Sequence, residues 1–205
     1  MTPARVGILG GTFNPPHDGH LALARAALDG LGLDRVLLMP VATAPHKRVP
    51  DDPGAEIRAE LCRLAVGGDG RLGLSTVELD RGGTSYTVDT LRSLCAERPE
   101  DELTLIVGAD MAASLPRWRE PEAVLALARV AVAERAGTGR AEVLASLAGL
   151  AGGEAVVFFE LPPVDVSSSA VRARVAAGES VLGLVPDAVA ARIAELGLYR
   201  HGDTA

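Results

Sequence analysis

Aromatic residues are scarce in this 205-residue chain, cysteines are few, and long apolar runs are absent. Phe, Tyr and Trp make up 3% of the residues, which argues against recognition of RNA by base stacking as the main activity. The two cysteines, Cys62 and Cys95, are far apart, which argues against a disulfide framework or a structural zinc site. No run approaches the ~20 apolar residues of a membrane-spanning helix, and Met1–Arg5 is too short for the start of a signal peptide. These absences predict a cytoplasmic protein.

Positive charge is also in short supply. The chain has 20 Lys and Arg against 27 Asp and Glu, a net charge of -7, which argues against a nucleic-acid partner. A phosphate ligand remains compatible with this balance, because a few local cations suffice to bind it. The apolar content of 48% and the charged content of 23% are typical of globular proteins. The length predicts a single domain over residues 1–205.

Short aliphatic runs alternate with helical patterns along the chain. Buried strands are predicted at Val6–Leu9, Val36–Met39, Leu72–Thr76, Leu103–Val107, Val130–Ala133 and Val156–Leu161. The spacing of apolar residues predicts helices at His20–Leu31, Ala55–Val66, Thr87–Ala96, Val171–Ala177 and Pro186–Leu196. This alternation predicts an α/β fold with a doubly wound, mostly parallel sheet and a small C-terminal helical subregion. The Gly-, Pro- and charge-rich segment Thr43–Gly54 is expected to be a mobile loop.

The segment Gly10–His20, GGTFNPPHDGH, directly follows the first predicted strand. Ligands of doubly wound sheets gather at the carboxyl ends of the strands, where glycines allow close approach and a helix start suits an anion. His17 and His20 are three residues apart, which places both imidazoles on one side of the first helical turn. Gly19 between them leaves room for a bulky group. Ordinary helix-start histidines are the alternative, but the whole combination favours a phosphate site.

Two other phosphate motifs do not fit this turn. A P-loop requires GxxxxGK[ST], and no lysine follows these glycines. The dinucleotide fingerprint requires GxGxxG and an acidic residue closing the second strand. Here the glycines are Gly7, Gly10 and Gly11, and the second strand ends in Leu38–Pro40 without a carboxylate.

A second cluster of hydroxyl groups lies near the C-terminus, in the sequence VDVSSSAVRARV. Ser167 is suited to cap a helix that begins with Ser168 and Ser169, and Arg172 lies one turn further along the same face. Helix capping alone explains one serine. Three hydroxyls beside free amides and an arginine indicate a further phosphate site.

These two segments resemble the signatures of HxGH-type nucleotidylyltransferases. GTFNPPHDGH resembles the phosphate-binding signature, and SSSAVR resembles the Ser/Thr-rich helix start that ends in Arg, although Thr is more common where Ser169 stands. The resemblance implies a Rossmann-like nucleotidylyltransferase fold. It also implies attack of a phosphate on the α-phosphate of a nucleoside triphosphate, with release of pyrophosphate. The implied catalytic residues are His17, His20 and Arg172, and the implied ATP site adds Gly10, Gly11, Thr12, Phe13, Ser167, Ser168 and Ser169.

Two segments carry side chains suited to the phosphate and carboxylate of an acceptor. His46 and Lys47, after the second strand, can neutralise a phosphate or belong to a solvated basic loop. Ser85, Tyr86 and Thr87 precede a helix whose free amides can receive a carboxylate or an amide, although Thr87 can equally be a simple N-cap.

Two more segments offer a sugar contact and a ring contact. Gly108 and Asp110 follow the fourth strand, where the carboxylate can bind ribose hydroxyls, cap the next helix, or do both. Trp118 presents a flat face for an aromatic ring, with core packing as the alternative.

Taken together, these segments resemble bacterial nicotinate-nucleotide adenylyltransferases in the same order from Val6 to Arg200. The resemblance implies transfer of AMP from ATP to nicotinate mononucleotide. It also implies that Trp118 stacks on the pyridine ring, that Ser85–Thr87 holds the carboxylate and that Asp110 binds ribose. The implied phosphate contacts are His46, Lys47 and Arg135. Mg²⁺ is expected to arrive with ATP, since no clustered Asp and Glu set predicts a metal site of the protein's own.

The chain departs from that family's pattern at two places. Arg135 is followed by Ala136 and Gly137, where Arg-Pro-Gly is common, and Arg119 follows Trp118, where some members have an aromatic residue. Three alternatives stay open: an HxGH enzyme acting on phosphopantetheine, one acting on nicotinamide mononucleotide, and a nucleotide-binding regulatory module. The oligomeric state also stays open, a homo-oligomer included.

Overall fold

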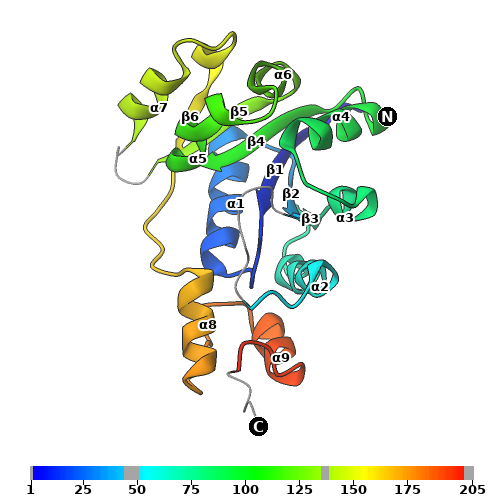
Figure 1. The fold of residues 1–205 in the computed structure, drawn as a ribbon, viewed down its shortest axis with the longest axis vertical. Helices are drawn as coiled ribbons and strands as arrows, with labels where there is room; N and C mark the ends of the chain where they lie inside the picture. The colour runs from blue at the N-terminus through cyan, green and yellow to red at the C-terminus, as the bar shows by residue number, and fades with distance from the viewer. Residues whose placement is uncertain (1, 44–50, 135–138, 201–205) are drawn as a thin grey trace.

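A six-stranded parallel sheet forms the centre of the molecule (Figure 1). The computed structural model describes residues 2–43, 51–134 and 139–200. Its strand order is β3-β2-β1-β4-β5-β6, the order of two βαβ halves that meet at the first strand. The strands are β1 Arg5–Gly11, β2 Arg35–Pro40, β3 Leu72–Leu74, β4 Glu102–Gly108, β5 Arg129–Glu134 and β6 Val157–Glu160. The predicted fold class and all six predicted strands are confirmed, with shifts at their ends.

Helices cover both faces of the sheet. The longer helices are α1 Asp18–Leu31, α2 Ala55–Val66, α4 Thr87–Glu97, α8 Ser168–Ala176 and α9 Asp187–Glu195. The shorter ones are α3 Val77–Arg81, α5 Ala109–Ser114, α6 Pro121–Leu127 and α7 Arg140–Leu147, with 3-10 turns at Leu115–Arg117 and Gly153–Ala155. Sequence patterns did not predict these four short helices, because five to eight residues are too few for a clear helical period.

The alternation of side chains along each strand builds two cores. In β4, Ile106 packs in the first core with residues of α1, α2, α8 and α9. Leu105 and Val107 of the same strand pack in the second core with residues of α4 to α7. Strands buried on both faces must be aliphatic at nearly every position, which explains the continuous apolar runs of the sequence.

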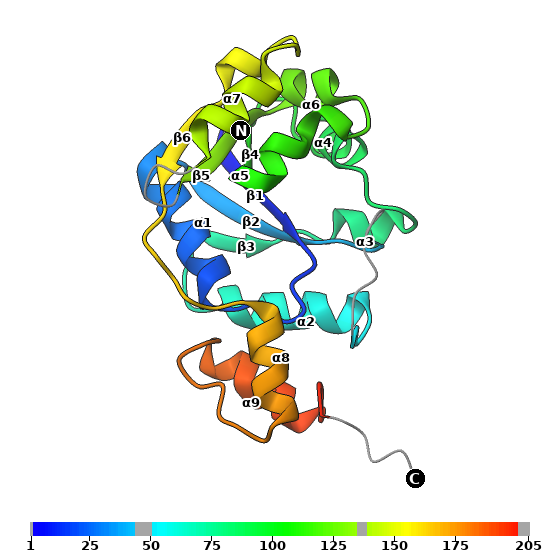
Figure 2. The same cartoon turned by 60° about the vertical axis from the view of Figure 1, so that its left-hand side comes forward.

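The expected C-terminal helical subregion consists of α8 and α9, which lie beyond α2 at one end of the molecule (Figure 2). Val189 and Ile193 of α9 belong to the first core, and Arg192 pairs with Glu60 of α2 at 2.8 Å. Among the described residues, no helix is long and apolar enough to cross a membrane.

Candidate active site

Strands β1 and β4 separate at their carboxyl ends. Their pairing ends at Ile8 and Leu105, whereas β1 continues to pair with β2 as far as Gly11, and β4 with β5 as far as Gly108. Among the described residues, a Cβ atom placed on Gly10 or on Gly108 would meet no other atom within 4 Å. The sheet therefore leaves open space at the point where its strand order reverses, the usual ligand position in this architecture.

The turn after β1 brings the two histidines of the predicted phosphate site together. The rings of His17 and His20 stack with centroids 3.6 Å apart, and the edge of Phe13 contacts His20 at 4.9 Å. The backbone N–H of His17 donates to Nδ1 of His20 at 3.2 Å. The expectation that Gly19 leaves room for a bulky ligand group is wrong. A Cβ atom added at Gly19 would lie 3.0 Å from Nδ1 of His17 and 3.1 Å from Val166. The bulky group at Gly19 is the ring of His17 itself.

Burial keeps both imidazoles neutral near pH 7. Desolvation lowers the pKa of His17 to about 4, and the residue is only 8% exposed. Desolvation, with a smaller contribution from neighbouring His17, lowers the pKa of His20 to about 3. Since Nδ1 of His20 accepts a hydrogen bond, the proton of the neutral ring resides on Nε2, which is then a donor.

The second predicted phosphate segment lies against this turn, although more than 150 residues separate the two. The hydroxyl of Ser168 donates to the carbonyl of Pro15 at 2.8 Å, and Nη1 of Arg172 donates to the carbonyl of Asn14 at 2.7 Å. Ser167 caps α8, as predicted, by accepting the N–H of Ala170 at 3.1 Å. The structure thus joins the two signatures into one site.

Asn14 gathers contacts from distant parts of the chain. Its Oδ1 accepts the hydroxyl of Tyr199 at 2.7 Å, and its Nδ2 donates to the carbonyl of Asp51 at 3.5 Å. The carboxylate of Asp51 lies 3.7 Å from Nε of Arg172, and Nη2 of Arg172 contacts Ser169 at 3.4 Å. Arg172 therefore already faces an anion, and a triphosphate at this position would compete with Asp51.

The sequence patterns did not identify Arg58 of α2 as a residue of the site. Its side chain is 1% exposed and bonds to the carbonyls of Thr12, Val41 and Ala42, behind the phosphate turn. A signal was present in the sequence: Arg58 shares the buried stripe of α2 with Leu61, Cys62 and Ala65. A charged residue at an apolar position of a helix indicates a specific buried partner.

The predicted carboxylate segment lies beside the end of β2. Ser85 is buried, and its Oγ accepts the N–H of Ala42 at 3.1 Å while its own N–H donates to Thr43 at 3.0 Å. Helix α4 begins at Thr87 with Tyr86 as its N-cap residue, so Thr87 is not the cap. Within the described residues, the N–H groups of Tyr86 and Thr87 have no protein acceptor.

The segment that contains Trp118 reaches the start of α4. Nε1 of Trp118 donates to Ser114 at 2.9 Å, which fixes the orientation of a partly exposed ring. The guanidinium of Arg119 lies 4.9 Å from the ring centroid of Tyr86 and 3.3 Å from Asp89. Arg119, the residue after Trp118, therefore links this segment to the start of α4.

The remaining predicted contacts divide into two groups. Gly108 is the N-cap residue of α5, and Asp110 is exposed in the first turn of that helix, at the carboxyl end of β4. His46, Lys47 and Arg135 lie outside the described residues. The described residues also contain no group of three or more His, Cys, Asp or Glu that could hold a metal ion.

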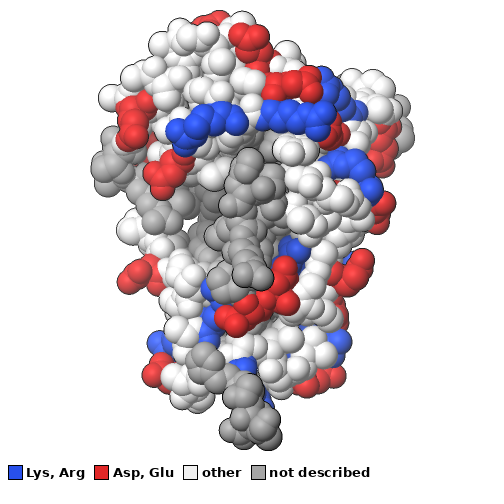
Figure 3. All heavy atoms as spheres, in the orientation of Figure 1, with Lys and Arg blue, Asp and Glu red and all other residues white. Residues whose placement is uncertain are grey.

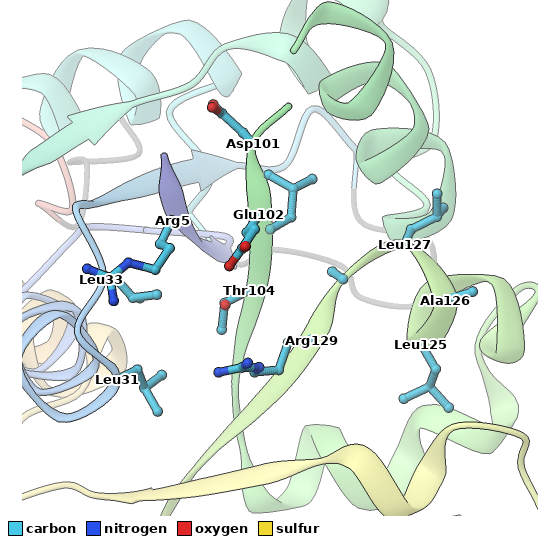
Figure 4. Close-up of a pocket in the computed structure, with 12 residues that line it drawn as sticks. Arg5, Leu31, Leu33, Asp101, Glu102, Thr104, Leu125, Ala126, Leu127 and Arg129 are labelled. Carbon is cyan, nitrogen blue, oxygen red and sulfur yellow. The ribbon is translucent and has the colours of Figure 1, made fainter. Parts of the chain in front are cut away.

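A separate pocket of about 290 Å³ lies at the amino ends of the strands, opposite the phosphate turn (Figure 4). It is lined by Arg5, Glu102, Thr104 and Arg129 near the amino ends of their strands, so it is not part of the phosphate site. On the face shown in Figure 3, basic and acidic side chains are interspersed rather than segregated.

The fold, the stacked histidines and the serine-rich helix start define a nucleotidyltransferase. A cytidylyltransferase-like family model matches residues 8–174. Probable nicotinate-nucleotide adenylyltransferases from Geobacter sp. (strain M21) and Roseiflexus sp. (strain RS-1) are 42% and 43% identical to the chain. The alignments cover 95% and 98% of this chain and 98% and 100% of those relatives. The chain belongs to this nicotinate-nucleotide adenylyltransferase family, which confirms the resemblance seen in its sequence.

Solved structures agree on the fold. A putative nicotinate-nucleotide adenylyltransferase from Vibrio parahaemolyticus superposes with a TM-score of 0.70 at 18% identity, covering 98% of both chains. The Plasmodium falciparum nicotinic acid mononucleotide adenylyltransferase complexed with NaAD has a TM-score of 0.76 at 15% identity. That match covers 96% of this chain and 97% of the other.

Proposed function

We propose that this chain transfers AMP from ATP to nicotinate mononucleotide, giving nicotinate adenine dinucleotide and pyrophosphate, in the cytoplasm. The observation that carries the proposal is the direct contact between two phosphate signatures that lie far apart in the sequence. Ser168 and Arg172 bond directly to the turn that holds His17 and His20. Residues 1–205 form a single nucleotidylyltransferase domain in this proposal, since α1 and α9 contribute to the same first core.

The reaction is a displacement at the α-phosphorus of ATP. A phosphate oxygen of the mononucleotide forms the new P–O bond, and the bond from the α-phosphorus to the bridging oxygen of pyrophosphate breaks. No side chain acts as a nucleophile. Catalysis comes from positioning the two anions and from stabilising charge on the five-coordinate phosphorus.

His17, His20 and Arg172 are the proposed catalytic residues. The Nε2–H of His20 is the free donor of its ring, because Nδ1 is held by the backbone of His17. Gly10 to Phe13 and Ser167 to Ser169 complete the ATP site with backbone amides and hydroxyls. Arg172 exchanges its contact with Asp51 for a phosphate when ATP binds.

The acceptor lies at the start of α4. The N–H groups of Tyr86 and Thr87 receive the nicotinate carboxylate beside Ser85, and Trp118 stacks on the pyridine ring. Asp110 binds ribose hydroxyls beside Gly108. His46, Lys47 and Arg135 are proposed phosphate contacts on sequence grounds alone.

Mg²⁺ accompanies ATP in this proposal. The carboxylate of Asp51 is paired with Arg172, and the described residues contain no group of three or more His, Cys, Asp or Glu that could hold a metal ion, so the triphosphate would supply most of the ligands of the ion. When bound, the ion neutralises charge on the triphosphate.

The choice of acceptor decides the function. We expect pyrophosphate release from ATP to be at least tenfold faster, as kcat/KM, with nicotinate mononucleotide than with nicotinamide mononucleotide, because a helix start favours the carboxylate over the neutral amide. A coupled pyrophosphate assay measures both rates, with phosphopantetheine as a third acceptor. Preference for the amide or for phosphopantetheine would overturn the substrate. ATP binding without turnover on any acceptor would instead indicate a regulatory module.

A further inference from the structure

Arg58 is the largest fully buried side chain among the described residues. Its guanidinium spreads over three backbone carbonyls: Nη1 donates to Thr12 at 3.0 Å, and Nη2 donates to Val41 at 2.8 Å and to Ala42 at 3.3 Å. Its Nε donates to the carboxylate of Asp52 at 3.0 Å. One side chain thus ties the chain after β1 to the chain after β2, and Asp52 balances its charge.

The contact with Thr12 also orients the next N–H group. In a trans peptide the C=O and the N–H point in opposite directions, so a Thr12 carbonyl directed at Arg58 directs the N–H of Phe13 away from it. The only cis peptide bond of the described chain is Asn14–Pro15. The Phe13 N–H has no acceptor among the described residues, and Phe13 holds a φ of 50°, which is uncommon outside glycine. This peptide therefore depends on external contacts for its orientation.

The contacts with Val41 and Ala42 extend toward the acceptor side. The N–H of Ala42 donates to Oγ of Ser85, and the N–H of Ser85 donates to the carbonyl of Thr43. Arg58 therefore braces, through one guanidinium, the turn at the ATP site and the strand end that carries the acceptor segment.

We propose that Arg58 is a positioning residue, which aims the Phe13 N–H at the phosphates of ATP and keeps the Ser85 segment in register with them. The inference rests on the proposed function. Only a planar guanidinium offers separate donors to two chain segments and a carboxylate at once, whereas a lysine has a single nitrogen.

Two variants test this role, Arg58→Lys and Arg58→Met, with Arg35→Met as the matched control. Arg35 pairs with Asp101 at 3.3 Å near the amino end of β2, far from the turn. At a temperature where each protein is folded, we expect Arg58→Met to lose about 10²-fold in kcat, because misplacing reacting groups is that costly. Arg58→Lys should restore part of the loss, and Arg35→Met should keep the wild-type kcat. A folded Arg58→Met with wild-type kcat and KM would overturn the inference.

A measurement on the wild-type protein covers the case in which the variants do not fold. In the isotope-labelled protein, ATP without acceptor should shift the backbone amide resonance of Phe13 strongly downfield. An unmoved Phe13 resonance at saturating ATP would contradict the role of Arg58, whatever the acceptor assay gives. Conversely, a shifted Phe13 resonance in a protein that releases no pyrophosphate would leave Arg58 as a nucleotide-positioning residue and remove the proposed reaction.

Discussion

The stacked histidines are held uncharged by the protein that surrounds them. Desolvation lowers the pKa of His17 to about 4 and that of His20 to about 3, against 6.5 for a free imidazole. Two cations with ring centroids 3.6 Å apart would repel each other, so the neutral pair is the stable form without ligand. A triphosphate bound beside the pair, as proposed, would add negative charge there and so favour protonation of the imidazoles.

The pair makes stability depend on pH. The unfolded chain takes up protons on both histidines as the pH falls below 6.5, whereas the folded chain does so only near pH 4 to 3. Stability is therefore lost as the pH falls through this window, by about 1.4 kcal/mol per pH unit for each histidine. We expect His20→Ala to remove about half of this pair's dependence and most of the turnover at pH 7.

Urea unfolding between pH 6.5 and 4.5 and the pyrophosphate assay at pH 7 measure the two effects. Wild-type acid sensitivity in His20→Ala would contradict the assigned burial of this ring. Near-normal turnover would contradict its catalytic role.

The three serines at the start of helix α8 make three different contacts. Ser167 caps the helix through Ala170, Ser168 docks it on Pro15, and Ser169 touches Arg172. The helix is short, and only Val171 is buried among its residues, so its start depends strongly on the cap.

Removal of the Ser167 cap should weaken the binding of ATP. Ser167→Ala is expected to cost about 1 kcal/mol and to lower the melting temperature by about 2–4 °C, with a higher KM for ATP because α8 carries Arg172. Ser146→Ala is the control, since Ser146 bonds within α7 in the other core and caps nothing. Calorimetry and initial rates provide the comparison, and an unchanged melting temperature and KM in Ser167→Ala would count against this assignment.

Asn14, near the N-terminus, is hydrogen-bonded to a residue near the C-terminus. Tyr199, 185 residues away, donates to Oδ1 of Asn14, and burial raises the pKa of this tyrosine well above its usual value. The last described turn of the chain therefore packs against the phosphate turn through Tyr199.

Loss of the Tyr199 hydroxyl should lower both the stability of the fold and the affinity for ATP. Tyr199→Phe removes the 2.7 Å bond and leaves Oδ1 of Asn14 without this donor, so we expect a loss of about 1–3 kcal/mol in unfolding free energy and weaker ATP binding. Denaturant unfolding and ATP titration calorimetry measure both quantities. If stability falls but ATP affinity does not, the contact serves the fold alone.

Features encoded over a few neighbouring residues were predictable from the sequence. The six strands, the start of α1 within two residues of its predicted position, the cap at Ser167 and the shared face of His17 and His20 depend on local pattern and helix geometry. The open space at Gly10 among the described residues is also a local property, because a glycine near the end of a parallel strand offers no side chain to fill it.

Contacts between distant segments could not be predicted in this way. The burial of Arg58 behind Thr12, the pairing of Asp51 with Arg172, and the bond from Tyr199 to Asn14 join residues that no local period relates. The space above Gly19 was misjudged for the same reason, since it is filled by the ring of His17, which stacks on His20, and by Val166 from a distant part of the chain. Periodicity along the chain thus determines which residues share one face of a helix or strand. Only the packed structure decides which groups hold them in place, because a buried charge or hydroxyl must find its partner wherever the fold places one.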